Sequence, residues 1–190
     1  MAKITEICWH GRGGQGAKTA ALLLAESAID EGMYGQGFPE YGPERMGAPV
    51  KGFNRISDEP IRVHSQITDP DIVVVLDPTL MDVVDVTAGL KENGLIIVNT
   101  PALPGEIRER LKLKGRKVYT IDATQIALDT IGRPIPNTVM IGAILKATGI
   151  LDLDFMIKNM QKKLSKKFNP KVVEGNVTAI KRASEEAKTE

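Results

Sequence analysis

A glycine-rich segment near the N-terminus has the residue pattern of a phosphate-binding turn. Gly11-Arg12-Gly13-Gly14-Gln15-Gly16 matches G-x-G-x-x-G and lies between a short apolar segment and a stretch rich in Ala, Leu and Glu. Glycines at this spacing allow a tight turn, and they leave the first amides of the following helix free to bind a phosphate. The pattern therefore predicts an anion-binding loop at residues 11–16.

Three further interpretations of this loop remain open. An NAD- or FAD-binding fold needs an acidic residue about 20 positions on, but the nearest candidate, Glu40, lies 24 positions past Gly16 in a Pro/Gly-rich segment. A nucleoside triphosphatase loop needs Lys directly after its last glycine, whereas Ala17 precedes Lys18 here. In the third interpretation, the glycines only let the first helix pack close to the sheet.

A second polar segment, Phe38–Pro49, has the sequence FPEYGPERMGAP. Its prolines stiffen the backbone, while Glu40, Glu44 and Arg45 offer directional polar contacts, and rigid functional loops often combine these two properties. A guanidinium can bind a phosphate or carboxylate through two parallel hydrogen bonds. We therefore treat Glu40, Glu44 and Arg45 as candidate site residues. The alternative is that Arg45 only pairs with one of the two glutamates to hold the loop.

The remaining titratable residues form no recognisable catalytic set. His10 borders the glycine loop and is a candidate site residue, whereas His64 is predicted on a strand surface or in a hairpin. Cys8 lies in an apolar segment and is expected to be an inert buried thiol. Asp77 ends an apolar run, where α/β folds place ligands, or it caps the next helix. We find no metal-ligand spacing and no nucleophile–base pair, so the sequence predicts no metal site.

The elements that position these residues alternate between strands and helices. The unbroken apolar runs at 71–77 and 95–99 are typical of parallel strands covered on both faces. A strand at 4–9 leads into the glycine loop, and a helix follows at 17–32. Further strands are predicted at 33–38 and 117–122, and further helices at 80–90, 104–114, 123–131, 138–148, 154–167 and 170–188.

This alternation predicts an α/β fold, a three-layer sandwich around a mostly parallel sheet. A hairpin formed by residues 50–56 and 61–65 would make the sheet mixed. The 190 residues contain no repeat or recognisable linker, so residues 1–190 are expected to form one domain.

Composition excludes several classes of function. The 25 Lys and Arg residues against 24 Asp and Glu residues give a net charge of +1, which argues against a dedicated nucleic-acid or membrane-surface binder. A single cysteine excludes an intramolecular disulfide, and also an all-cysteine zinc or iron–sulfur site built by this chain alone. With no recognisable targeting or membrane-spanning segment, a cytoplasmic location is expected.

Taken together, the two motifs resemble a known family. The segments WHGRGGQG (9–16) and FPEYGPERMGAP (38–49), followed by DPDIVVVLD (69–77) and Pro136-Asn137-Thr138, resemble the gamma subunits of pyruvate:ferredoxin oxidoreductase, or pyruvate synthase. The related 2-oxoglutarate and branched-chain 2-oxoacid enzymes share G-x-G-G-Q-G and a similar second loop. The residues around Trp9 and Glu44-Arg45-Met46-Gly47 look more like the pyruvate branch.

The resemblance implies a Rossmann-like domain within a larger enzyme. Such enzymes convert pyruvate and coenzyme A to acetyl-CoA and CO₂ with electron transfer to ferredoxin, or run the reverse reaction. Thiamine diphosphate, Mg²⁺ and [4Fe–4S] clusters would be carried by alpha, beta and delta partner subunits, and this chain would bind none of them alone. The isolated chain would be inactive.

Within that family, the working hypothesis assigns binding roles to both motifs. Backbone amides of residues 11–16, with charge from Arg12, Lys18 and Arg45, would face coenzyme A or partner subunits. The alternatives are a gamma subunit for 2-oxoglutarate or 2-oxoisovalerate, a stand-alone NAD- or FAD-binding protein, and a purely structural subunit that scaffolds the complex.

Overall fold

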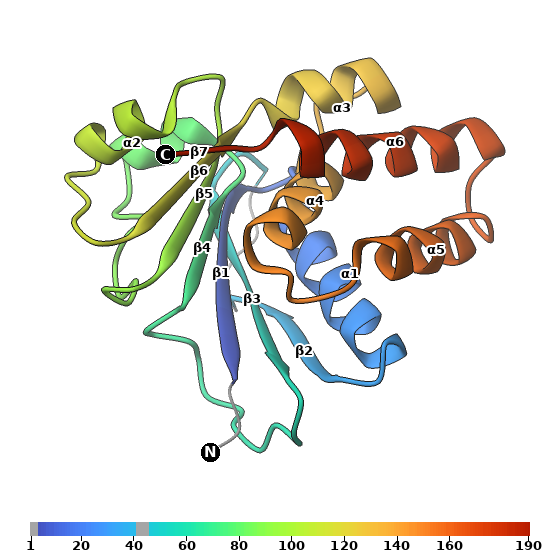
Figure 1. Ribbon diagram of the computed structural model, residues 1–190, viewed down its shortest axis with the longest axis horizontal. Helices are drawn as coiled ribbons and strands as arrows, with labels where there is room; N and C mark the ends of the chain where they lie inside the picture. Colours follow the sequence, from blue (N-terminus) through green and yellow to red (C-terminus); the bar gives the residue numbers. More distant parts are fainter. Residues whose placement is uncertain (1–3, 41–45) are drawn as a thin grey trace.

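The described residues form a seven-stranded mixed sheet with helices on both faces. The structure is a computed structural model that describes residues 4–40 and 46–190. The strand order is β2-β3-β1-β4-β5-β6-β7, and Figure 1 shows the strands side by side. The strands are β1 (Thr5–Arg12), β2 (Tyr34–Pro39), β3 (Pro49–Ser57), β4 (Ile72–Val75), β5 (Leu95–Asn99), β6 (Lys117–Ile121) and β7 (Lys188–Thr189). The helices are α1 (Ala17–Asp30), α2 (Pro104–Arg110), α3 (Ala123–Ile131), α4 (Asn137–Thr148), α5 (Leu153–Leu164) and α6 (Pro170–Glu186), with a 3₁₀ turn η1 (Pro78–Asp82).

The expected α/β sandwich is confirmed, and its mixed character has a different origin from the one predicted. Strands β1, β4, β5 and β6 are parallel, while β3 runs antiparallel to both β1 and β2. The predicted hairpin of residues 50–56 with 61–65 is wrong, because β3 already has a partner on each side and offers no free edge. Residues 61–65 follow Pro60 as irregular chain.

The predicted helix at 80–90 is also wrong. Only the short 3₁₀ turn η1 forms, and turns follow it. The Asp85 carboxylate accepts hydrogen bonds from both the amide and the hydroxyl of Thr87 (2.9 and 2.7 Å), and such local bonds compete with helix formation. Three valines in the same segment lower its helix propensity further. At the C-terminus, α6 ends at Glu186, and β7 pairs with β6 where helix was predicted.

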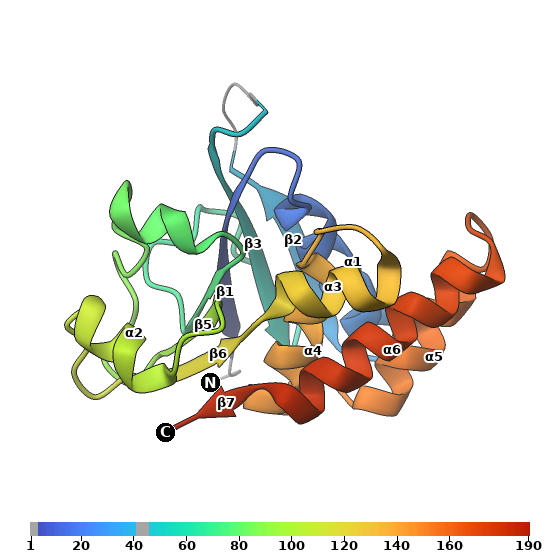
Figure 2. The same cartoon turned by 90° about the horizontal axis from the view of Figure 1, so that it is seen from above.

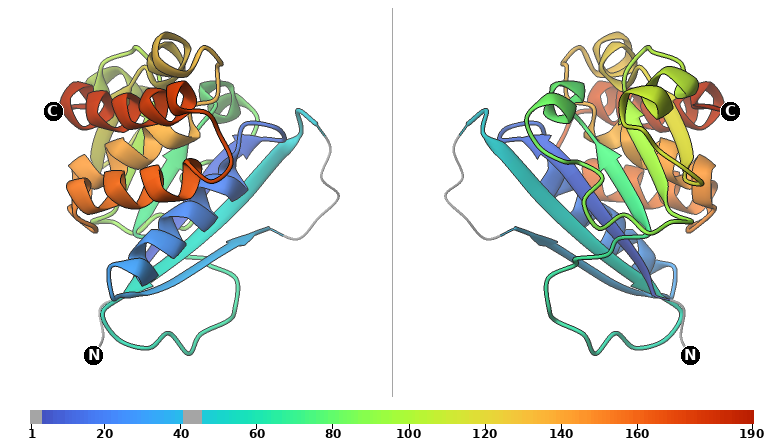
Figure 3. Two further views of the ribbon diagram at one scale, coloured as in Figure 1. Left: turned by 90° about the vertical axis from the view of Figure 1, so that its right-hand side faces the viewer. Right: turned by 90° about the vertical axis from the view of Figure 1, so that its left-hand side faces the viewer.

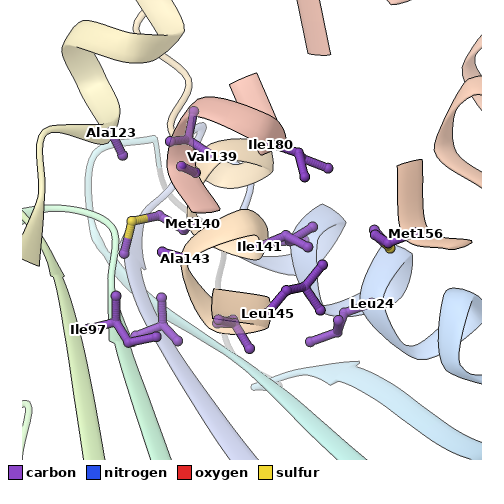
Figure 4. Close-up of a cluster of buried hydrophobic side chains, with 14 of the residues drawn as sticks. Leu24, Ile97, Ala123, Val139, Met140, Ile141, Ala143, Leu145, Met156 and Ile180 are labelled. Carbon is purple, nitrogen blue, oxygen red and sulfur yellow. The ribbon is translucent and has the colours of Figure 1, made fainter. Parts of the chain in front are cut away.

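Two hydrophobic clusters cover the two faces of the sheet. On one face, α1, α3, α4, α5 and α6 pack over side chains such as Trp9, Val74 and Ile97. On the other, η1, α2 and the turns around residue 86 cover Cys8, Val73 and Val75. Figure 2 shows these layers from above. Helix α4 is central to the larger cluster, and Figure 4 shows its apolar residues between Ile97 of the sheet and Ile180 of α6.

Helix α1 lies unusually close to the strands because glycines form the floor beneath it. A Cβ at Gly35 would stand 2.4 Å from the carbonyl oxygen of Ala25, and one at Gly37 would stand 2.7 Å from that of Ala21. No side chain fits there. The polar pair Trp9 and Asn54 completes this contact, since the Asn54 amide accepts from the indole (2.8 Å) and donates to the Ala21 carbonyl (2.7 Å). This packing fixes the start of α1 at the end of β1.

Candidate functional site

The two motifs meet at one edge of the sheet. Strand β1 continues through Arg12, three residues beyond its predicted end, because it stays paired with β3 as far as Pro49. Beyond it, the Gly13 amide donates to the Ala48 carbonyl (2.9 Å), and the Gly47 amide donates to the Gly13 carbonyl (3.2 Å). The structure therefore places the end of the Phe38–Pro49 segment directly against the glycine loop.

The glycines of the loop have different physical roles. Gly16 has φ of +84° at the start of α1, a conformation that favours glycine. A Cβ there would also come within 2.5 Å of the Asn137 side-chain amide. Gly14 has φ of +97° but open space around it, whereas a Cβ at Gly11 would meet Leu76 at 3.1 Å. Close packing thus explains Gly11 and contributes at Gly16, and backbone conformation explains Gly14 and Gly16.

The start of α1 presents unused backbone donors. The first helical hydrogen bond runs from the Ala20 amide to the Gly16 carbonyl (2.9 Å), and no side chain in the described part of the chain caps this end. The amides of residues 17–19 therefore lack helical partners, as at the start of any α-helix. Such amides, together with the helix dipole, favour an anion.

A polar network connects the glycine loop to the end of β4 and to η1. The Gln15 side chain accepts from the Arg12 amide (2.7 Å) and donates to the Asp77 carboxylate (2.8 Å). The Arg12 guanidinium pairs with the same carboxylate (3.2 Å) and donates to the Thr79 hydroxyl (2.8 Å) and the Gly47 carbonyl (3.1 Å). Asp77 thus ties the end of β4 to the loop, and it also accepts from the Thr79 amide to cap η1 (2.9 Å).

The electrostatics of Asp77 follow from these contacts. Partial burial raises the pKa of this carboxyl, but hydrogen bonds from Thr79 and Gln15, with the charge of Arg12, hold the pKa below its ordinary value. Both alternatives raised for Asp77 from the sequence therefore apply, because it caps the 3₁₀ turn and lies at the loop. Its charge stays paired with Arg12 at neutral pH.

A cleft of about 390 Å³ opens between the two motifs. Lys18 on the first turn of α1 and Lys51 on β3 bring positive charge to it, and Glu40 brings one carboxylate, 4.0 Å from the Lys51 ammonium. The cleft is lined by Arg12, Gly13, Gly14, Gly16, Ala17, Lys18, Thr19, Pro39, Glu40, Met46, Val50 and Lys51. Backbone amides beside two lysines are groups that suit a phosphate-bearing or other anionic ligand.

His10 lies outside this cleft. Its side chain is buried on the face of the sheet opposite α1, with its Nε2 atom 3.5 Å from the Cys8 sulfur. Burial, helped by the charge of Lys51 and opposed by that of Asp85, lowers the pKa of His10 to about 4. Burial also raises the pKa of the Cys8 thiol to about 12. The expected buried cysteine is confirmed, and a neutral His10 at neutral pH is a packing residue next to the site.

The predicted site residues are thus only partly brought together. The glycine loop, Lys18 and Glu40 meet at the cleft, and Arg12 is shared between the cleft and Asp77. Glu44 and Arg45 lie outside the described residues. Sequence reasoning missed Lys51, whose place at the cleft depends on strand register and left no signal in the motif. It also missed the contact of Asn137 with Gly16, which joins residues far apart in the chain.

Metal-binding groups and membrane-spanning helices are both absent from the described residues. Among them, no group of three or more His, Cys, Asp or Glu side chains is placed to hold a metal ion. None of the helices in residues 4–40 and 46–190 is both long and apolar enough to cross a membrane.

Comparison with known proteins gives the family. Residues 6–186 match the family described as pyruvate ferredoxin/flavodoxin oxidoreductase. The chain is 51% identical over 180 residues to the "Pyruvate/ketoisovalerate oxidoreductases common subunit gamma" of Pyrococcus abyssi, covering 95% of both chains. It is 48% identical over 186 residues to "Pyruvate synthase subunit PorC" of Thermotoga maritima, covering 98% of this chain and 96% of the relative.

A solved structure gives the same answer. The crystal structure of pyruvate oxidoreductase subunit PORC from Thermotoga maritima superposes with a TM-score of 0.85 at 43% identity, covering 98% of each chain. These similarities fit the expected oxidoreductase subunit and not the alternative of a stand-alone nucleotide-binding protein. The chain belongs to the pyruvate ferredoxin/flavodoxin oxidoreductase family, and the expected gamma-subunit type is confirmed.

Proposed function

We propose that this chain is the gamma subunit of a pyruvate synthase. The assembled enzyme would convert pyruvate and coenzyme A to acetyl-CoA and CO₂ and reduce ferredoxin, or run the reverse reaction. The observation that carries this proposal is the match over residues 6–186, together with relatives about half identical over 95% of their length and named as such subunits. The gamma chain works in a complex with alpha, beta and delta subunits.

The role of this chain within the complex is to present an anionic-ligand cleft. Free amides at the start of α1, with Lys18 and Lys51, suit the phosphate groups of coenzyme A. Arg45, which lies outside the described residues, would add a positive charge. The cleft offers recognition rather than bond-making groups, so its residues would bind and orient coenzyme A or contact a partner subunit.

The redox and thiamine chemistry belongs to other subunits in this proposal. A [4Fe–4S] cluster is held by four cysteine thiolates, and this chain has one cysteine, which is buried. Thiamine diphosphate, its Mg²⁺ and the clusters would therefore sit on partner subunits. The isolated gamma chain would be inactive, and its place would be the cytoplasm.

Choice of 2-oxoacid is assigned to partner subunits as well. The name of the Pyrococcus abyssi relative states that one gamma subunit is common to pyruvate and ketoisovalerate oxidoreductases. A subunit shared by two substrates is suited to the part of the reaction that both have in common, and coenzyme A is such a part. Within this proposal, substitutions in the cleft would change the KM for coenzyme A and leave that for pyruvate unchanged.

Reconstitution of the complex with variant gamma chains tests the proposal. Lys18→Ala and Arg45→Ala should each raise the KM for coenzyme A several-fold, because each removes a positively charged side chain that would attract the phosphates of the ligand. Lys166→Ala is the matched control, since this exposed lysine lies between α5 and α6, away from the cleft. Unchanged assembly, coenzyme A affinity and turnover in both variants would overturn the binding role. Parallel loss of assembly and turnover at unchanged KM would instead indicate a scaffold.

A further inference from the structure

Strand β2 forms one edge of the sheet, and within the described residues only one of its sides is paired. It pairs with β3 alone, and Figure 3 shows it as the outermost strand beside α1. The Glu40 amide, just past the end of β2, donates to the Lys51 carbonyl (3.0 Å). Because successive residues of an antiparallel strand point alternately toward the partner and away from it, Gly35 and Gly37 direct their N–H and C=O groups outward. These groups can bond another strand.

This edge lacks the features that commonly prevent strands from pairing. Natural edge strands place charged side chains, bulges or prolines along the edge. Residues 34–38 read Tyr-Gly-Gln-Gly-Phe, with no charge and no proline, and they pair with β3 without a bulge. Pro39 follows only at the end of the strand. β2 is therefore a strand that another extended segment can join.

The order of residues in β2 is symmetric about its centre. On either side of Gln36 stands a glycine, followed by an aromatic residue, Tyr34 or Phe38. A two-fold axis at Gln36 would place Tyr34 opposite the second copy's Phe38, and Gly35 opposite its Gly37. Each such glycine pair would exchange both N–H···O bonds. A symmetric strand suits an identical partner, because an isologous interface must be complementary to itself.

The side chains around this axis are compatible with self-pairing. A residue on the axis meets its own copy, so a charged residue there would repel itself. Gln36 is neutral, and its amide both donates and accepts. Tyr34 is 44% exposed, and the partly buried Phe38 already lies against Phe53, with ring centroids 5.5 Å apart. The second copy's Tyr34 would extend this row of rings, and cross-strand aromatic pairs stabilise sheets.

Exposed apolar side chains of α1 lie on the same side of the molecule. Leu22 and Ile29 are 38% and 54% exposed, and their spacing of seven residues puts them on one side of the helix. That side adjoins Ala21 and Ala25, which face β2, and lies opposite Ser27, whose hydroxyl accepts from α5 (3.0 Å). In the two-fold pair, both α1 helices would cover the same face of the joined sheet. Leu22 and Ile29 would then lie toward the second copy.

We propose that the β2 edge, meaning residues 34–38 with Leu22 and Ile29 of α1, binds a second copy of this chain and joins the two seven-stranded sheets into one. This inference goes beyond the function proposed above and does not depend on it. The surface is short, so the pair belongs to the weak class of interfaces that bury less than about 1,200 Å² in total. A dissociation constant in the micromolar range is expected.

Sedimentation equilibrium of the full chain measures this association. The wild-type mass should rise from 20.6 kDa toward twice that value as the concentration increases from about 1 to 100 µM. Leu22→Glu should raise the dissociation constant about tenfold, because it places an unpaired carboxylate of each copy in the contact. Leu128→Glu is the matched control, since this leucine is 42% exposed on α3, which lies away from β2 (Figure 1). Circular dichroism checks that both variants are folded.

A cysteine at the axis tests the register of the pair. Gln36 would face its own copy in a non-hydrogen-bonded pair, with Cα atoms about 4.5 Å apart, which is within disulfide range. Gln36→Cys should therefore form a cross-linked dimer under mild oxidation. Tyr34→Cys should not, because its two copies would lie about 13 Å apart along the strands. The native Cys8 is buried and should not contribute.

Three results would overturn the pairing. The first is a wild-type chain that stays monomeric up to about 100 µM. The second is a dimer that Leu22→Glu leaves unchanged or that Gln36→Cys fails to cross-link, because it would use another surface or register. The third is protection of the Gly35 and Gly37 amides from hydrogen exchange only in the assembled enzyme, which would assign the β2 edge to another subunit. None of these results bears on the KM for coenzyme A, so the proposed function would stand.

Discussion

Asp77 is the residue through which the glycine loop can be perturbed without touching the loop itself. Its carboxylate accepts from Gln15 and Thr79 and pairs with Arg12, and its side chain is 14% exposed. Replacement by alanine removes the cap of η1, which is worth about 1 kcal/mol. It also removes the hydrogen bond from Gln15 and the ion pair with Arg12, both made to a mostly buried carboxylate. Together these losses predict that Asp77→Ala lowers the free energy of unfolding by about 2 to 3 kcal/mol.

Asp77→Asn removes the negative charge of the side chain and keeps nearly the same shape. The asparagine oxygen can still accept from the Thr79 amide, but its NH₂ group would then face two donors, Gln15 and Arg12. We expect a loss of about 1 to 2 kcal/mol at pH 7, smaller than that of Asp77→Ala. Urea denaturation of the full chain, followed by circular dichroism, measures both values, and Asp58→Asn on an exposed turn serves as the control.

The pH dependence gives a sharper criterion. The pKa of Asp77 is lower in the folded chain than in the unfolded one, so its stabilisation is complete above the unfolded value near 4 and is lost as pH falls through the folded value. The stability gap between the wild-type chain and Asp77→Asn should therefore narrow below pH 4. Equal stability of the two chains at pH 7, or a gap that widens on acidification, would refute the reasoning.

Three further predictions concern buried groups. His10, with a pKa lowered to about 4, should show no imidazole titration by NMR above pH 5.5, and a titration midpoint near 6.5 would contradict its burial. Because the unfolded chain protonates His10 first, the free energy of unfolding should fall as pH falls from 6.5 to 4. The Cys8 thiol, with a pKa of about 12, should not react with an aromatic disulfide reagent at pH 8 until the chain unfolds. Rapid reaction in the folded chain would contradict the burial of Cys8. Gly37→Ala should destabilise the fold by about 2 to 3 kcal/mol, because the Ala21 carbonyl opposes its methyl group. Gly105→Ala, where the nearest atom to the added methyl group is 3.7 Å away, should cost less in the same denaturation experiment.

Local sequence patterns located most strands and helices. The valine and isoleucine runs at 72–75 and 95–99 are buried strands, because only strands covered on both faces tolerate unbroken apolar residues. The helix at 123–131 has the predicted bounds, with Asp122 capping its start and Gly132 ending it. The segments 61–65 and 80–90 were mispredicted, since the first depended on which strand edges were already occupied and the second on side-chain bonds to turn backbone.

The candidate site, too, could be predicted from the sequence only in part. The glycine loop and its position before a helix can be recognised in the sequence, because backbone conformation and free helix amides are local properties. Lys51, in contrast, reaches the cleft through the pairing of β3 with β1 and β2. Arg55 of β3 likewise holds the 58–70 connection through the carbonyls of Val63 and Ser65, and no spacing in the sequence indicates these contacts.

By itself, the sequence determined the α/β class, the glycine-rich turn before the first helix and the family, because each depends on motifs of residues that are adjacent in the chain. The tertiary structure alone decided that Arg12 is paired with Asp77, that His10 is buried outside the cleft, and that Lys51 lines the cleft. The physical reason is that burial, charge pairing and cleft shape arise between segments brought together only when the sheet assembles.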